Sequence, residues 1–167
     1  HYVFFADEVF GVKQSWLDEF EIRYKNEVGL PFYIEYHPKA LNSTRLRKLV
    51  NAGLDQIDFG IEACSDSVRN QVFDRKGTNN EIIDLATEIN GYGVKISYDL
   101  ILDNPYDSEE SLKNAVEVLL RLPKPLSFNL FSLQYFPHYP LTKKAIEDGH
   151  IQPQEVTVDQ LMQRTTN

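Results

Sequence analysis

The sequence has a single cysteine, Cys64, among its 167 residues. The chain therefore has no internal disulfide and no metal site built from several of its own cysteines. It also lacks a run of about 18 apolar residues and a basic and apolar signal segment, so we expect no membrane span and a cytoplasmic location. Stability must then come from a packed core.

Basic residues are the minority among the charged side chains. There are 17 Lys and Arg against 25 Asp and Glu, which gives a formal net charge of −8. Because no dense Lys/Arg cluster is present, we do not expect direct binding to nucleic acid. A hydrophobic content of 42% is enough for the core of about one domain. The chain begins at His1 inside a strand-like run, and we interpret it as a segment of a longer protein.

The stretch VKISYDLILDNPYDSEE, residues 94–110, is the part of the sequence that indicates the fold most clearly. It starts as a nearly continuous apolar run, breaks at Asp103-Asn104-Pro105, and passes through Ser108 into an amphipathic segment. This order predicts a strand, a polar turn and a helix. A strand buried on both faces is typical of a parallel sheet, where functional groups gather at the carboxyl ends of the strands.

Predicted strands and helices alternate along the whole chain. Aromatic and β-branched runs predict strands at 2–5, 32–36, 56–61, 94–102 and 126–133. Apolar residues at helical spacing, with caps and glycine or proline stops, predict helices at 15–28, 43–52, 65–73, 79–90 and 109–122. In the last of these we expect five residues to point inward: Leu112, Ala115, Val116, Leu119 and Leu120.

Five strands that are each followed by a helix require parallel pairing with right-handed crossovers. Either an open doubly wound sheet or part of a (β/α) barrel fits. The segment 7–11 is not the glycine-rich phosphate loop of doubly wound folds, and polar residues follow every strand. We therefore predict an α/β fold, a partial (β/α) barrel of about five parallel strands with outer helices over 1–142. Residues 143–167 are expected to form a peripheral helical tail.

Four segments resemble barrel strands of radical S-adenosylmethionine (radical SAM) enzymes, particularly the class with an N-terminal cobalamin-binding domain. They are FADEVF (5–10), FGIEACSDSV (59–68), GVKISYDLILDNPYDSEESL (93–112) and FSLQYFPHYPL (131–141). The resemblance implies strands two to six of an Fe-S oxidoreductase barrel. In that family S-adenosylmethionine (SAM) chelates one iron of a [4Fe-4S] cluster and is cleaved reductively to a 5′-deoxyadenosyl radical. It also implies cobalamin in an upstream domain.

The family holds its cluster with three cysteines in a C-x-x-x-C-x-x-C loop, and this loop is missing here. Cys64 alone cannot replace three thiolates. We therefore predict no metal ligand in this chain and an inactive isolated chain, although the parent protein is expected to be an enzyme.

The resemblance also implies cofactor contacts. Glu62 matches the glutamate that contacts the ribose, and a carboxylate accepts hydrogen bonds from a diol. Asp7 and Glu8 follow the strand that contacts the methionyl ammonium. Neighbouring strand residues face opposite ways, so only one of this pair points inward, and we favour Asp7. A structural ion pair is the alternative for these carboxylates.

Three further residues complete the predicted cofactor site. Glu35 is expected to line the cavity with Tyr33 facing away, or else to form a structural pair. Tyr98, like Asp103, stands where many relatives have glycine, and it either faces the ligands or belongs to the core. Gln134 follows the last strand, near the position of the adenine in the family.

Two other classes of function remain open. The chain is either a non-catalytic binding module from a degenerate barrel, or a cluster-independent barrel lyase or isomerase that uses Asp7, Glu35 and Glu62 as acid and base. The expected partners are a small-molecule cofactor and an unknown substrate. Residues 2–5 would form an unpaired aromatic edge strand, which predicts a homodimer through that edge.

Overall fold

The computed structural model describes residues 1–7, 10–153 and 156. These residues form one five-stranded sheet in the order β1-β2-β3-β4-β5, and every neighbouring pair is parallel. The strands are β1 (Val3–Phe5), β2 (Phe32–Tyr36), β3 (Leu54–Glu62), β4 (Lys95–Ile101) and β5 (Ser127–Phe131). Within the described residues β1 and β5 each pair on one side only, so the sheet is not closed. The predicted partial barrel of five parallel strands is confirmed.

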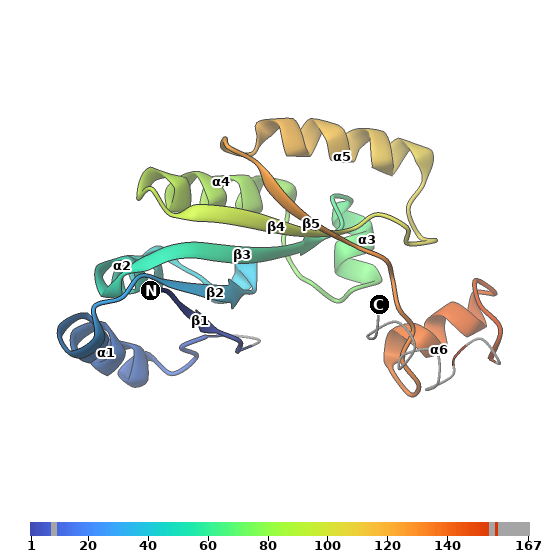
Figure 1. Cartoon of the computed structure of the whole chain (residues 1–167). Helices are drawn as coiled ribbons and strands as arrows, with labels where there is room; N and C mark the ends of the chain where they lie inside the picture. The colour runs from blue at the N-terminus through green and yellow to red at the C-terminus, as the bar shows by residue number, and fades with distance from the viewer. Residues whose placement is uncertain (8–9, 154–155, 157–167) are drawn as a thin grey trace.

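Helices connect the strands. They are α1 (Gln14–Arg23), continued by a π-helical turn (Tyr24–Val28), α2 (Ser43–Ala52), α3 (Asp66–Gln71), α4 (Asn79–Gly91), α5 (Glu109–Arg121) and α6 (Pro140–Glu147). A 3-10 turn (Pro38–Ala40) precedes α2. Figure 1 shows α1, α2, α4 and α5 flanking the sheet, whereas α3 and α6 lie toward the carboxyl ends of the strands.

Local sequence signals explain where the helices begin. The Thr78 hydroxyl accepts from the Glu81 amide at 3.3 Å, and the Glu81 carboxylate accepts from the Thr78 amide at 2.8 Å, so a capping box begins α4. Ser108 caps α5 in the same way with Ser111 as its partner. Asn42 caps α2 by accepting from the Arg45 amide at 3.0 Å.

The helix predicted at 15–28 begins without the side-chain cap that the sequence predicts for it. Helix α1 begins one residue earlier, at Gln14, and the cap residue Lys13 makes no side-chain capping bond. In the first turn, Asp18 accepts from the Gln14 side chain at 2.8 Å. A hydrogen bond between the side chains at i and i+4 therefore replaces the predicted cap.

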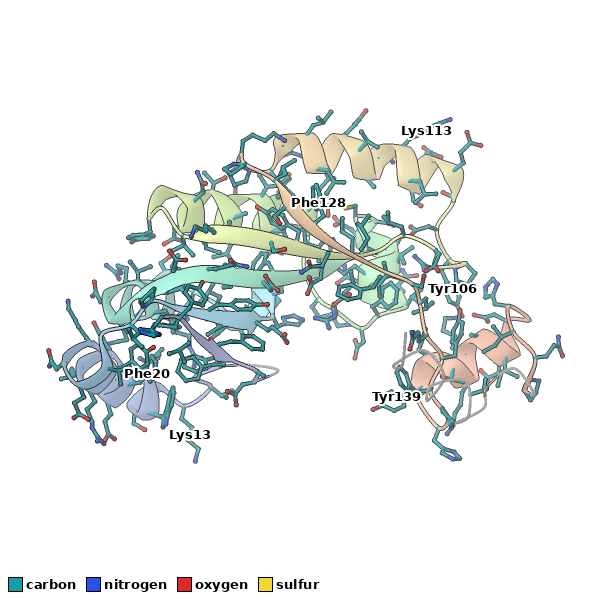
Figure 2. The ribbon with its side chains drawn as sticks, in the orientation of Figure 1. Lys13, Phe20, Tyr106, Lys113, Phe128 and Tyr139 are labelled. Atoms are coloured by element: carbon teal, nitrogen blue, oxygen red, sulfur yellow. The ribbon has the colours of Figure 1, made fainter. Side chains whose placement is uncertain are left out.

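The core lies between the helices and the face of the sheet that they cover. Phe32, Ile34, Ile57 and Phe59 are fully buried there. Aromatic rings fill the end next to α1, and the Phe20 ring centroid lies 5.1 Å from that of Phe10 and 5.6 Å from that of Phe32. Figure 2 labels Phe20 on α1. This packing determines which face of β1 and β2 is buried, and therefore which face of the sheet remains polar.

Helix α5 packs through a narrower face than its sequence predicts. Leu112, Val116 and Leu120 are 41%, 56% and 68% exposed, so the prediction that they point inward is wrong. Val118 is buried, and Ala115 is partly buried against the core. The apolar stripe of α5 is wider than the surface that the sheet offers it, so one edge of the stripe remains in solvent.

Helix α6 follows β5 after an extended segment, residues 132–139, and reaches the rest of the chain through Tyr106. The Tyr106 ring lies 4.5 Å from the His150 ring, and the Lys144 ammonium lies 5.4 Å from the Tyr106 centroid. Figure 2 labels Tyr106 beside this region. Within the helical tail predicted at 143–167, residues 154–155 and 157–167 lie outside the described residues, so the tail as a unit remains a prediction.

No helix in the described part of the chain is long and apolar enough to cross a membrane. The edge strand β1 has three residues, of which Phe4 is 48% exposed. The homodimer through this edge remains a prediction.

Candidate functional site

The face of the sheet opposite the core is polar, and we call it the open face. It is built by the strand residues that alternate with the core residues. Glu35 on β2 pairs in register with Asp58 on β3, Gly60 pairs with Asp99 on β4, and Asp99 pairs with Asn129 on β5. Side chains from four neighbouring strands therefore meet on one surface.

An open pocket of about 480 Å³ lies at the carboxyl ends of these strands. Its lining consists of Glu35, Tyr36, His37, Asp58, Gly60, Glu62, Arg75 and Asp99. A smaller hollow of about 290 Å³ contains Val94 and Leu126 in a largely apolar lining that includes one charged residue, Lys95. The pocket at the carboxyl ends is the candidate site because its charged groups lie at the end of the parallel strands where such sheets bind their ligands.

Glu62 and Arg75 form an ion pair at the mouth of this pocket. The Arg75 Nη2 atom lies 2.9 Å from Glu62 Oε1, and the Glu62 side chain is 15% exposed. Glu62 has a φ of 65°, a left-handed conformation that is unusual for a residue other than glycine. Strain of this kind concentrates at functional sites.

Gly60 leaves the space that this ion pair needs. A Cβ atom at position 60 would lie 3.0 Å from Glu62 Oε1 and 3.3 Å from Arg75 Nη1. Both side chains therefore lie directly against the backbone of β3. A ligand that contacts the pair would also approach this backbone closely.

The carboxyl groups of the pocket shift one another's pKa. Burial raises the pKa of Glu62, while the Arg75 guanidinium lowers it and Asp99 raises it further. Burial also raises the pKa of Asp99, whereas a hydrogen bond of 2.9 Å from the Asn129 amide lowers it. Loss of solvent raises the pKa of Glu35, with Asp58 and Asp99 adding to the shift. Four carboxyl groups and one guanidinium line the pocket, so it favours a ligand with positive charge.

A buried arginine holds the segment that carries Arg75. Arg69 is 2% exposed, and its Nη1 atom donates to the Ala63 carbonyl at 2.7 Å and to Asn79 Oδ1 at 2.9 Å. Its Nη2 atom pairs with Asp66. The Arg75 amide donates to the Arg69 carbonyl at 2.9 Å. The position of Arg75 therefore depends on Arg69.

The structure brings two of the predicted cofactor residues, Glu35 and Glu62, into the same pocket. The expectation that Tyr33 faces away from Glu35 is wrong, since residues two apart on a strand share a face. Tyr98 is 0% exposed, pairs with Phe59 and packs on the side of the core, so the expectation that it faces the ligands is wrong and its core alternative is confirmed.

The other two predicted residues lie elsewhere. Asp7 lines a separate hollow beside Phe10 and Trp16, so the pocket does not unite it with Glu35 and Glu62. Gln134 is exposed after the end of β5. Glu8 falls outside the described residues. The contacts that the resemblance implies for Asp7 and Gln134 remain predictions.

Cys64 is buried, and burial raises the pKa of its thiol to about 11. Among the described residues no group of three His, Cys, Asp or Glu side chains is placed to hold a metal ion.

Several residues of the site were not among the predicted cofactor contacts, including Asp99, Asp58, Asn129 and Arg75. Asp58 and Asn129 lie inside predicted strands, and the alternation of Gln56, Asp58 and Gly60 with apolar residues was a signal that could have identified the polar face. Arg75 lies in a connecting segment without periodicity. Its role follows only from the three-dimensional path of that segment.

Several solved structures of radical SAM enzymes share this fold. The radical S-adenosylmethionine methyltransferase TsrM from Kitasatospora setae, with cobalamin and a [4Fe-4S] cluster bound, matches 80% of this chain and 25% of its own chain, at 14% identity and a TM-score of 0.65. Coproporphyrinogen III oxidase (HemN) from Escherichia coli matches 92% of this chain and 36% of its own, at 18% identity and a TM-score of 0.61.

The cobalamin-dependent radical enzyme OxsB, with aqua-cobalamin bound, matches 92% of this chain and 23% of its own, at 19% identity and a TM-score of 0.60. This chain thus spans between about a quarter and somewhat over a third of these proteins. No family model matches the sequence. No curated protein is significantly similar to it. At these identities the likeness shows the fold.

Proposed function

We propose that this chain forms the SAM-binding wall of a radical SAM enzyme, an Fe-S oxidoreductase that cleaves SAM reductively to start radical chemistry. The observation that supports this proposal most directly is the group Glu62, Arg75 and Asp99. It stands at the carboxyl ends of adjacent strands, in a fold that solved radical SAM enzymes share. Parallel barrels bind their ligands at this end of the strands.

The chemistry of the pocket complements that of SAM. SAM carries a ribose diol, an ammonium, a carboxylate and a sulfonium. The carboxylates of Glu62 and Asp99 are suited to accept from the two ribose hydroxyls, and the Arg75 guanidinium is suited to bind the methionyl carboxylate with two parallel hydrogen bonds. The excess of carboxyl groups around them favours the sulfonium and the ammonium.

The cluster does not fit this chain. One buried cysteine provides a single thiolate, and the described residues contain no three-residue metal group. In the proposed parent protein the cluster ligands, and any cobalamin-binding domain, come from residues outside these 167. The role of this chain is then to orient SAM, and reductive cleavage belongs to the whole protein.

The test of the proposal is SAM binding by the chain. We expect Arg75→Met to weaken SAM affinity about tenfold, because a charge-assisted pair of hydrogen bonds to the carboxylate is lost. Equilibrium dialysis with radiolabelled SAM measures this. The matched control is Arg47→Met, since Arg47 lies on the exposed side of α2 and donates to the Ser43 carbonyl. Equal affinities in the two variants would contradict the assignment of Arg75.

Anaerobic reconstitution of the isolated chain with iron and sulfide is expected to give no stoichiometric [4Fe-4S] cluster and no SAM cleavage, because three thiolate ligands are required. Absorption and electron paramagnetic resonance spectra measure cluster content. A chain that binds one cluster per molecule would show that its ligands are present after all.

A further inference from the structure

His37 lines the pocket beside Arg75 but is not among the proposed SAM contacts. It directly follows β2, and its Nδ1 atom accepts a hydrogen bond of 3.1 Å from the Lys39 amide. Pro38 favours the extended backbone that His37 has, with a φ of −84° and a ψ of 130°. These two restraints hold the imidazole ring in place before a ligand arrives.

The hydrogen bond from Lys39 determines which ring nitrogen of His37 carries the proton. An Nδ1 atom that accepts a hydrogen bond carries no proton, so the proton of the neutral ring is on Nε2. Burial lowers the pKa of His37, and the charges of Arg75 and Lys39 lower it further, so the ring is neutral at pH 7. Within the described part of the chain Nε2 makes no hydrogen bond, and it is not buried. His37 therefore offers an accessible, uncharged N–H donor.

The lining of the pocket is rich in acceptors and poor in donors. Its four carboxyl groups can only accept hydrogen bonds when they are ionised, and Gly60 has no side chain. Tyr36 is 3% exposed and belongs to the core, where its hydroxyl lies 3.5 Å from the Arg45 guanidinium. Arg75 and His37 are therefore the two side chains of this lining that are available to donate to a ligand.

A bound carboxylate needs more donors than Arg75 provides. Two parallel hydrogen bonds from a guanidinium use one lone pair on each carboxylate oxygen and leave one lone pair on each oxygen free. Arg75 Nη2 also lies 2.9 Å from Glu62 Oε1, so part of its donor capacity is already used. A remaining lone pair that is removed from water requires another donor. The Nε2–H group of His37 provides one without adding a second positive charge next to Arg75.

We propose that His37 is a second residue that recognises the carboxylate of SAM, by donating from Nε2–H to an oxygen that Arg75 does not saturate. This inference deepens the proposed function and rests on it. A ligand that lacks the carboxylate leaves this donor without a partner, and sites built to hydrogen-bond a polar group discriminate against analogues without it. His37 thus contributes to the specificity of the pocket for SAM over decarboxylated SAM.

The experiment measures the binding of SAM and of decarboxylated SAM by equilibrium dialysis. His37→Asn keeps an acceptor for the Lys39 amide but does not reach the position of Nε2, whereas His37→Gln places an amide N–H near that position. We expect His37→Asn to weaken SAM binding about tenfold and to leave the binding of decarboxylated SAM unchanged. We expect His37→Gln to restore most of the SAM affinity. His138→Asn is the matched control, because His138 is exposed, lies outside the pocket, and has a φ of 69° that asparagine tolerates.

Nitrogen-15 NMR of the imidazole ring tests the inference without a ligand. We expect His37 to show a protonated Nε2 and an unprotonated Nδ1 at pH 7, and the opposite tautomer would overturn the inference. It is also overturned if His37→Asn binds SAM as tightly as His138→Asn, or if His37→Asn weakens the binding of both ligands equally, as a purely structural role would. If the unsubstituted chain binds neither ligand, the proposed function and this inference are both rejected. SAM binding that depends on Arg75 but not on His37 rejects this inference alone.

Discussion

Replacing Arg69 with methionine is expected to lower the free energy of unfolding by about 3 kcal/mol, since several buried acceptors lose their donor. The Arg69 guanidinium is 2% exposed and donates to the carbonyls of Ala63 and Gly77 and to the Asn79 side chain. Methionine fills part of the volume but donates nothing. Urea denaturation followed by circular dichroism measures the change.

The control for this substitution is Arg47→Met on the surface of α2, which is expected to change the free energy of unfolding by less than about 0.5 kcal/mol. The Arg69 variant should also bind SAM more weakly at temperatures where it remains folded, because the Arg69 guanidinium donates to the Gly77 carbonyl, two residues after Arg75, and methionine cannot. Identical urea midpoints for the Arg69 and Arg47 variants would show that the buried network contributes nothing to stability.

Gly60→Ala is expected to lower SAM affinity at least tenfold while leaving the fold intact. The added Cβ would stand 3.0 Å from Glu62 Oε1 and 3.3 Å from Arg75 Nη1, so both side chains must move away from the strand. Both atoms lie at the ends of flexible side chains, so their movement costs little folding free energy. The effect should therefore appear in a SAM titration and only weakly in a melting curve.

Gly91→Ala provides the comparison, because a Cβ at Gly91 meets nothing within 4 Å. Alanine is favoured over glycine in a helix, so this variant should be as stable as the parent or slightly more stable, with unchanged SAM binding. If Gly60→Ala binds SAM as tightly as Gly91→Ala, Glu62 and Arg75 do not take part in SAM binding.

The sequence predicted the elements well because their signals are local. The capping box of Thr78 and Glu81 and the left-handed glycine after α2, Gly53, mark helix ends through interactions of residues that are close in the chain. The alternation in β3 likewise separates core residues such as Phe59 from open-face residues such as Asp58. Signals of this kind can be recognised in the sequence without knowledge of the tertiary structure.

The site was harder to predict because it depends on contacts between distant segments. Arg75 enters the pocket because hydrogen bonds from Arg69 and Asn70 hold its segment in place. Tyr98 was ambiguous because β4 is flanked by core on one side and by a polar face on the other, and a tyrosine suits both. The exposure of Leu112, Val116 and Leu120 was not predicted. The apolar residues of α5 indicate that one face is buried, but they do not indicate how wide the surface of the sheet is that covers this face.

The order of the strands has a consequence for how the chain folds. Each strand pairs with the next one in sequence, as when Val3 pairs with Phe32 and Gln56 with Lys95. Each pairing therefore closes only the connection between neighbouring strands, which between β3 and β4 contains the two helices α3 and α4. Closing these connections costs less conformational entropy than pairing strands that are distant in the sequence would cost. The sheet can therefore grow strand by strand during synthesis, and the polar pocket on β2, β3 and β4 takes shape only after β4 has joined.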